Sequence, residues 1–220
     1  MPELIFKIEG AEAIPYAASP LLHLKTKITC AGSHTDIQNI LLQCQIQIEP
    51  AQRHYLAVEK NNLRDLFGAP ARWSQTLRPI LWANSQLVVP PFQGTTSTNV
   101  PVPCTFDFNV ASTKYLHGLE GDEIPICILF SGTIFYLEAD GSLRVAKIPW
   151  SQEINHRLPV RVWKEMMDMY YPNTAWLCLQ RGLFDQLHRY KMDRGIPTWD
   201  QALETLLVDA EEASSRKIRA

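Results

Sequence analysis

The stretch LLHLKTKITC, residues 21–30, decides the fold class, because apolar and polar side chains alternate along it. One face carries side chains that favour burial, and the other carries side chains that favour water. The first face holds Leu22, Leu24, Thr26, Ile28 and Cys30, and the second holds His23, Lys25, Lys27 and Thr29. A period of two residues is typical of a β-strand with one face against a core. The pattern therefore predicts a half-buried strand.

A second stretch with the same period follows after the turn-forming residues AGSHTD, 31–36. In LLQCQIQIE, residues 41–49, the apolar side chains are separated by glutamines. The inward set is Leu42, Cys44, Ile46 and Ile48, and the outward set is Gln43, Gln45, Gln47 and Glu49. Since a short turn separates the two stretches, we expect them to form an antiparallel pair.

Further strands are expected up to residue 150. The candidates are QLVVPPF (86–92), VPVPCTFDFNV (100–110), IPICILFSGTIFYLE (124–138) and LRVAKIPW (143–150). Within 100–110 the alternation places Cys104, Phe106, Phe108 and Val110 inward and Asp107 outward. Between the early and later strands, NNLRDLFG (61–68) has the apolar spacing of a short helix that ends at Gly68.

The last third changes to helical spacing. Helices are predicted over 159–171, 182–195 and 198–210, the last beginning with a capping box of Thr198 and Gln201, while AWLCLQ (175–180) has the alternation of one more strand. The fold class that fits is α+β, an antiparallel β-sandwich or curled sheet with C-terminal helices. The predicted organisation is a β domain over 1–150 with a short helical insertion near 57–82, a helical part over 151–210 packed on the sheet, and a disordered tail over 211–220.

Composition argues against several classes of partner. The net charge is -2, and basic residues are mixed with acidic ones along the chain, whereas phosphate contacts need a clustered basic face. We therefore expect no nucleic-acid partner. No stretch approaches 18 apolar residues, and MPELIFKIEG at the start resembles neither signal peptide nor anchor, so no membrane span is expected. Five widely spaced cysteines without such a signal indicate reduced thiols and a cytoplasmic location.

No motif for catalysis, metal binding or a cofactor stands out. The chain lacks the glycine-rich phosphate loop and the nucleophile elbow, and Cys30 with His34 is a single half-site for zinc. No catalytic residue, metal ligand or cofactor is therefore predicted. The alternative is an enzyme with a pocket between sheet and helices, built on His117, Asp107 and Glu123.

Aromatic residues crowd the segment 150–199, which includes PNTAWLCLQRGLFDQLHRYK, residues 172–191. As core residues they would join the helices to the sheet. Replacing Trp176 by alanine would then lower the free energy of unfolding by roughly 3–5 kcal/mol. As a docking face they would act together with neighbouring arginines, because interface centres are rich in Tyr, Trp and Arg. The predicted binding residues are Tyr171, Trp176, Arg181 and Arg189.

Several longer segments of the sequence resemble those of a known family. They are LLQCQIQIEPAQRHY, DLFGAPARWSQTLRPILW, VPVPCTFDFNVASTKYLHGLEGDEIPICILFSGTIFY, LPVRVWKEMMDMYYPNTAWLCLQRGLFDQLHRYK and GIPTWDQALETLL. Nearly end to end, the chain resembles an uncharacterised bacterial family of unknown function whose members are often encoded beside genes of actinobacterial-type nickel–iron hydrogenases and their maturation factors. The resemblance implies an accessory protein that helps to assemble a hydrogenase or stays bound to it. It implies no catalytic residue.

Three functions remain open at this point. The first is a non-enzymatic, chaperone-like accessory or assembly protein that binds a partner polypeptide, such as hydrogenase subunits or maturation factors. The second is an enzyme of unknown reaction, and the third is a structural subunit of a larger complex. A homo-oligomer is compatible with each. A contiguous exposed apolar patch would favour the first function, and a deep pocket that gathers polar groups would favour the second.

Overall fold

The computed structural model describes residues 2–31, 36–138, 140–174 and 176–219, and the chain divides into two compact units, 1–176 and 177–220. The strands, all in the first unit, are β1 (Glu3–Ala13), β2 (Leu21–Ala31), β3 (Asp36–Ile48), β4 (Ile80–Val89), β5 (Phe92–Gln93), β6 (Thr95–Pro103), β7 (Glu123–Leu137), β8 (Leu143–Lys147) and β9 (Glu153–Pro159). The helices of that unit are η1 (Pro50–Gln52), α1 (Ala57–Asn62), α2 (Arg64–Phe67), η2 (Pro70–Arg72), α3 (Trp73–Thr76), α4 (Ala111–His117) and α5 (Val160–Tyr170). The second unit holds α6 (Arg181–Asp193) and α7 (Trp199–Arg219).

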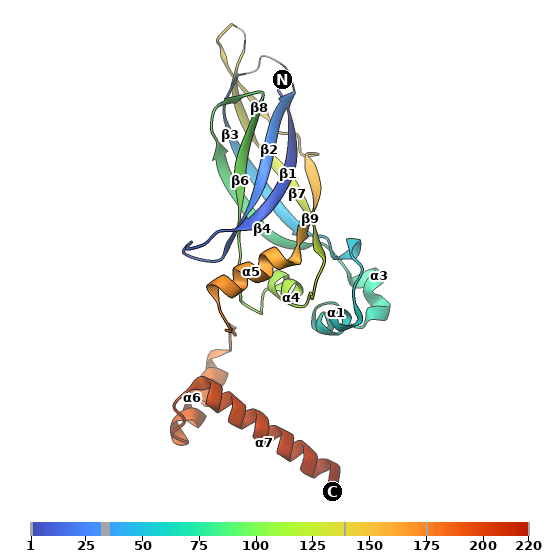
Figure 1. Ribbon diagram of the computed structural model, residues 1–220, viewed down its shortest axis with the longest axis vertical. Coiled ribbons are helices and arrows are strands. Elements are labelled where there is room, and N and C mark those ends of the chain that lie inside the picture. The colour runs from blue at the N-terminus through green and yellow to red at the C-terminus, as the bar shows by residue number, and fades with distance from the viewer. Residues whose placement is uncertain (1, 32–35, 139, 175, 220) are drawn as a thin grey trace. The chain divides into compact units, whose positions relative to one another are not determined.

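Over the described residues the strands form two antiparallel sheets (Figure 1). One has the order β1-β2-β6, and the other has the order β4-β3-β7-β8 with β5 paired to β3 and β9 paired to β7. Neither path returns to its first strand, so the sheets stay open. The predicted α+β class, with antiparallel sheets and helices at the C-terminal end, is confirmed.

The core lies between the two sheets and takes alternate side chains from each strand. The inward faces predicted for 21–30 and 41–49 are confirmed, since Leu22, Leu24, Ile46 and Ile48 are fully buried. The outward glutamines of β3 are exposed or half-buried. Alternation therefore identified correctly which side of each strand faces away from water.

The expected pairing of 21–30 with 41–49 is wrong. β2 pairs with β1 and β6, whereas β3 pairs with β4, β5 and β7, so the two strands belong to different sheets. The hydrophobic pattern requires each apolar face to meet another apolar face. Two such faces can meet across the core as well as side by side in one sheet. The turn between them lies partly in 32–35, outside the described residues.

The strand expected over 100–110 is displaced. β6 covers Thr95–Pro103 and so begins with the polar residues TTSTN, 95–99, while the chain leaves the sheet before Phe106. Asp107 accepts hydrogen bonds from the backbone N–H (2.9 Å) and the side-chain amide (3.1 Å) of Asn109, which forms a turn in place of a ladder. Val110, expected inward, is exposed and precedes α4.

The helical regions agree in outline with the prediction. The insertion consists of α1 to α3 and ends at Thr76, and α2 stops at Gly68, whose φ of 74° suits glycine. Helices α5, α6 and α7 occupy the three predicted segments. Strand β9 pairs with β7 inside the part described as helical, 151–210, and ends where the helix predicted over 159–171 begins; α7 continues to Arg219 through most of the expected tail. An unbroken run of helix-favouring residues such as Ala210, Glu211 and Glu212 explains that extension.

Two segments with ambiguous patterns are also settled. The segment 124–138 could form one strand or two strands that meet at Ser131 and Gly132, and it forms one continuous strand, β7, over Glu123–Leu137. Gly132 lies against the backbone of Leu41 so closely that a Cβ atom there would collide with the Leu41 carbonyl, and its φ of 146° also favours glycine. AWLCLQ forms no strand among the described residues and contributes only an isolated bridge between Trp176 and Asp107. No helix in the described part of the chain has the length and apolar character to cross a bilayer.

Candidate functional site

Five contacting rings form a row beside α4 and α5 of the first unit. We call it the aromatic row, and it consists of His117, Phe108, Phe106, Tyr171 and Trp176. The ring centroids are 4.7 Å apart for His117 and Phe108, 5.2 Å for Phe108 and Phe106, 5.4 Å for Phe106 and Tyr171, and 5.4 Å for Tyr171 and Trp176. Phe106 in the middle of the row is buried, whereas Trp176 at one end is 60% exposed.

Separate segments of the first unit bring these rings together. The loop after β6 supplies Phe106 and Phe108, and the residue after α5 supplies Tyr171. A backbone bridge between Asp107 and Trp176 holds the two segments side by side. The neighbouring Tyr170 fixes the end of α5, because its hydroxyl donates a hydrogen bond to the Ile14 carbonyl at 2.6 Å and accepts one from the backbone N–H of residue 17 at 2.8 Å.

Charged side chains line two hollows beside the part of the row that His117, Phe108 and Phe106 form. One hollow of about 360 Å³ is lined by Asn62, Asp65, Leu66, Phe108, Lys114, His117, Gly118 and Glu120, and one of about 270 Å³ by Phe106, His117, Glu120, Trp163, Lys164, Met167 and Asp168. Lys114 pairs with Asp65 at 2.6 Å, and Lys164 lies 3.8 Å from Glu120. The arrangement has an apolar centre and a charged rim, which is the usual anatomy of a protein interface.

The imidazole of His117 lies where both hollows meet. Burial lowers its pKa below the ordinary value, the positive charge of Lys164 lowers it further, and the carboxylate of Glu120 partly opposes both. The neutral imidazole is therefore favoured at neutral pH. A neutral ring fits an apolar row better than a charged one would, because it carries a smaller desolvation cost.

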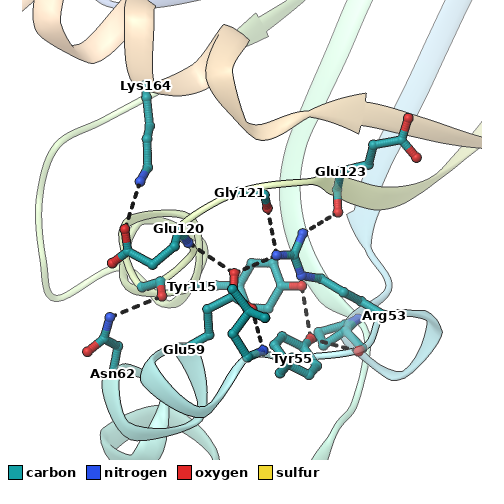
Figure 2. A network of polar contacts seen from close by, with 12 residues as sticks. Arg53, Tyr55, Glu59, Asn62, Tyr115, Glu120, Gly121, Glu123 and Lys164 are labelled. Atoms are coloured by element: carbon teal, nitrogen blue, oxygen red, sulfur yellow. Dashed lines mark hydrogen bonds and ion pairs between the residues drawn. The ribbon is translucent and has the colours of Figure 1, made fainter.

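A buried polar network holds the loop that follows α4 (Figure 2). Arg53 donates to the carbonyls of Glu123 (2.5 Å) and Gly121 (2.6 Å) and to a carboxylate oxygen of Glu59 (2.5 Å). That carboxylate also accepts the backbone N–H groups of Glu120 at 3.0 Å and Leu56 at 2.9 Å. The network fixes Glu120 beside the aromatic row, so its role is to position the rim.

Sequence reasoning missed this network. Arg53 and Glu59 are both almost fully buried, and nothing in their spacing distinguishes them from ordinary surface charges of a helical insertion. The one available signal was the acidic residue at the third position of α1, where Glu59 accepts the N–H of Leu56 as in a capping box.

The predicted binding residues divide between the two units. The structure brings Tyr171 and Trp176 into contact in the first unit. Arg181 and Arg189 are exposed residues of α6 in the second unit, and their binding role stays a prediction. The interpretation of Trp176 as a core ring is wrong, because most of its surface is exposed. The ring that joins α5 to the core is Trp163, which is 2% exposed.

The three residues proposed for an enzyme are not gathered in one pocket. His117 lines the two hollows beside the aromatic row, whereas Glu123 lines a separate hollow of about 500 Å³ together with Gln52, Arg53, His54, Asp122 and Arg157. The carboxylate of Asp107 is used in the turn with Asn109. Among the described residues no three His, Cys, Asp or Glu side chains are grouped so as to hold a metal ion.

Fold and site together define a class: an open antiparallel sandwich with an exposed aromatic row at one end and a separate helical unit. A family model matches residues 1–215, and the chain belongs to that family, DUF6084, a family of unknown function. No curated protein matches the chain.

Two solved structures show weak likeness to this chain. A Bordetella pertussis protein named ApaA is 12% identical with a TM-score of 0.25, covering 72% of this chain and 95% of its own. A structural-genomics target named SoR45 is 11% identical with a TM-score of 0.22, covering 71% of this chain and 84% of its own. TM-scores this low carry no conclusion about fold or function.

Proposed function

We propose that the protein is a non-enzymatic, chaperone-like accessory or assembly factor that binds a partner polypeptide through the aromatic row. The observation that carries this proposal is Trp176, which is 60% exposed and yet held in place by the ring of Tyr171. A large apolar ring kept in water costs free energy unless a partner covers it. Trp and Tyr are also the residues most enriched among those that dominate binding energy at interfaces.

The packing of the row on the core supports the same role. Tyr171 stacks on buried Phe106 with the ring planes 10° apart, so the exposed end of the row rests on the core. A partner would therefore meet a surface that is already ordered and would lose little side-chain entropy in binding it. The charges of Lys164, Glu120 and Asp168 at the rim would then select the partner and its orientation.

The partner that we propose is a subunit or a maturation factor of a nickel–iron hydrogenase, bound in the cytoplasm. This choice is supported by the resemblance of the longer sequence segments to a family whose members are often encoded beside such hydrogenase genes. In this proposal the partner contributes an apolar segment that covers Trp176 and Tyr171.

The experiment is affinity purification of the tagged full-length protein from its native cell, followed by mass spectrometry. Three baits are compared: the wild type, Trp176→Ala, and Trp150→Ala as the matched control, because Trp150 is 89% exposed and lies outside the row. Recovery of hydrogenase subunits or maturation factors with the wild type and Trp150→Ala, and their loss with Trp176→Ala, is the expected result. Equal recovery of these proteins with all three baits, or no recovery with the wild type, would contradict the proposal. Either result would favour an enzymatic role for the residues that line the hollows.

A further inference from the structure

The second unit, α6 and α7 with the residues that join them, has almost no core of its own. Among the side chains of this unit that the structure describes, only Ala202 is buried. Trp199 at the start of α7 contacts the rings of Phe184 at 5.5 Å and His188 at 6.0 Å, both on α6. A unit of 44 residues with so little burial needs additional apolar contacts to stay folded.

The unit also exposes large apolar side chains along both helices and before them. They are Leu177, Leu183, Phe184, Met192, Trp199, Leu203, Leu207 and Val208. Trp199, Leu203 and Leu207 are four residues apart in sequence, so they follow one stripe along α7. Trp199 at its start packs on α6, whereas Leu203 and Leu207 are exposed, and an exposed apolar stripe of this kind indicates a docking face.

The two helices carry opposite charge. Residues 181–194, which are α6 and the residue after it, include four basic residues and two acidic ones. The basic residues are Arg181, Arg189, Lys191 and Arg194, and the acidic residues are Asp185 and Asp193. From 199 to 212, α7 has five acidic residues and no basic one, namely Asp200, Glu204, Asp209, Glu211 and Glu212, whereas the basic residues Arg216, Lys217 and Arg219 follow in its last turn. Arg194 and Asp209 join the two helices by an ion pair at 3.5 Å, and both side chains are about half exposed.

A surface that is basic on α6 and acidic along the first two thirds of α7 is complementary to itself. A two-fold axis brings the same patch of two copies together, so it can place α6 of one chain against α7 of the other. We propose that the protein forms a homodimer through its second unit, with the Trp199–Leu203–Leu207 stripe at the centre and α6–α7 charge pairs around it. A stable interface buries about 800 Å² per partner, contributed by roughly 20–30 residues, which two helices of this length can supply.

The proposal is independent of the aromatic row, which belongs to the first unit. Sedimentation velocity of the full-length protein tests it, with the mass of one chain being 25.1 kDa. The wild type should sediment as a dimer at micromolar concentration. The double variant Leu203→Lys with Leu207→Lys should sediment as a monomer, and the control Leu143→Lys, at an equally exposed leucine of β8, should remain a dimer.

A second variant tests the charge argument without touching the apolar stripe. Arg181→Glu combined with Arg189→Glu changes two exposed side chains of α6, and we expect the dimer dissociation constant to rise about tenfold or more at low salt. Trp176→Ala should leave the dimer unchanged. A wild type that is monomeric throughout, as expected if the stripe packs on the chain's own sheets, would overturn the proposal. So would a dimer that tolerates the two lysines.

Discussion

Phe6 of β1 and Phe130 of β7 stack face to face across the core, with ring centroids 4.2 Å apart and ring planes 8° apart. The two strands belong to different sheets, so this pair joins the halves of the sandwich. Phe130 is 1% exposed. The contact is part of the core of the first unit, and the same unit carries the aromatic row.

Replacing Phe130 by alanine should lower the free energy of unfolding by roughly 3–5 kcal/mol, because it removes a buried ring and leaves a cavity between the sheets. Urea denaturation followed by circular dichroism measures the change. Leu143→Ala, at an exposed position of β8, serves as the control and should change stability by no more than about 0.5 kcal/mol. A similar small change for Phe130→Ala would show that the sheets do not pack as described.

Glu59→Gln should destabilise the protein by roughly 3–5 kcal/mol, because the buried Arg53 guanidinium loses its counter-charge. Burial alone would raise the pKa of the Glu59 carboxyl, but the N–H groups of Leu56 and Glu120 and the charge of Arg53 outweigh it, so the pKa lies below its ordinary value of 4.5. The stability that the carboxylate contributes is present above pH 4.5 and is lost as the pH falls through the lowered pKa.

The wild type should therefore lose stability in this acid range more steeply than Glu59→Gln does. Unfolding free energies measured from neutral pH downward for both proteins give the comparison. Glu12→Gln, which breaks the half-exposed pair with Lys25, should cost no more than about 1 kcal/mol. Parallel pH curves for wild type and Glu59→Gln would mean that the Glu59 carboxyl has the same pKa in the folded and the unfolded protein.

Trp163→Ala and Trp176→Ala should differ strongly in stability although both remove an indole near α5. Trp163 is buried in the core, so its loss should cost roughly 3–5 kcal/mol. Trp176 is mostly exposed, so its loss should cost about 1 kcal/mol or less. Melting curves of the two variants decide the matter, and a large loss for Trp176→Ala would restore the interpretation of that ring as part of the core.

Lys164→Ala should raise the pKa of His117, because the positive charge that disfavours the imidazolium is removed while Glu120 remains. A proton NMR titration of the imidazole C–H signals measures the pKa. His156 provides the internal control, since burial lowers its pKa and Glu123 opposes that effect without any contribution from Lys164. If the pKa of His117 did not move, the rim of the aromatic row would be arranged differently.

Most of the strand content was predictable because alternation reports which side of a strand is buried. Leu22 and Leu24 of β2, and Ile46 and Ile48 of β3, all face the core as expected. Strand pairing was not predictable, because an apolar face specifies burial but not the hydrogen-bonded neighbour. The alternation of apolar and polar residues also continues through Phe106. It therefore does not indicate the turn at Asp107, where a side-chain hydrogen bond takes the place of strand pairing.

The aromatic row was predictable only in part. Tyr171 and Trp176 stood out as amphipathic rings beside arginines, but their contact with Phe106 and Phe108 joins segments more than sixty residues apart. The exposure of Trp176 was not visible either, because a tryptophan in an alternating segment suits a core and an interface equally well. The rim charges depend on the buried pair of Arg53 and Glu59, whose burial no local pattern indicates.

The most direct test of the proposed function is the affinity of the purified protein for a purified nickel–iron hydrogenase subunit or maturation factor, measured by isothermal titration calorimetry. The wild type and Trp150→Ala should bind with equal affinity. Trp176→Ala should lose at least about 2 kcal/mol of binding free energy, roughly a thirtyfold rise in Kd, while its melting temperature stays close to that of the wild type. Unchanged affinity of Trp176→Ala would contradict a partner bound on the aromatic row.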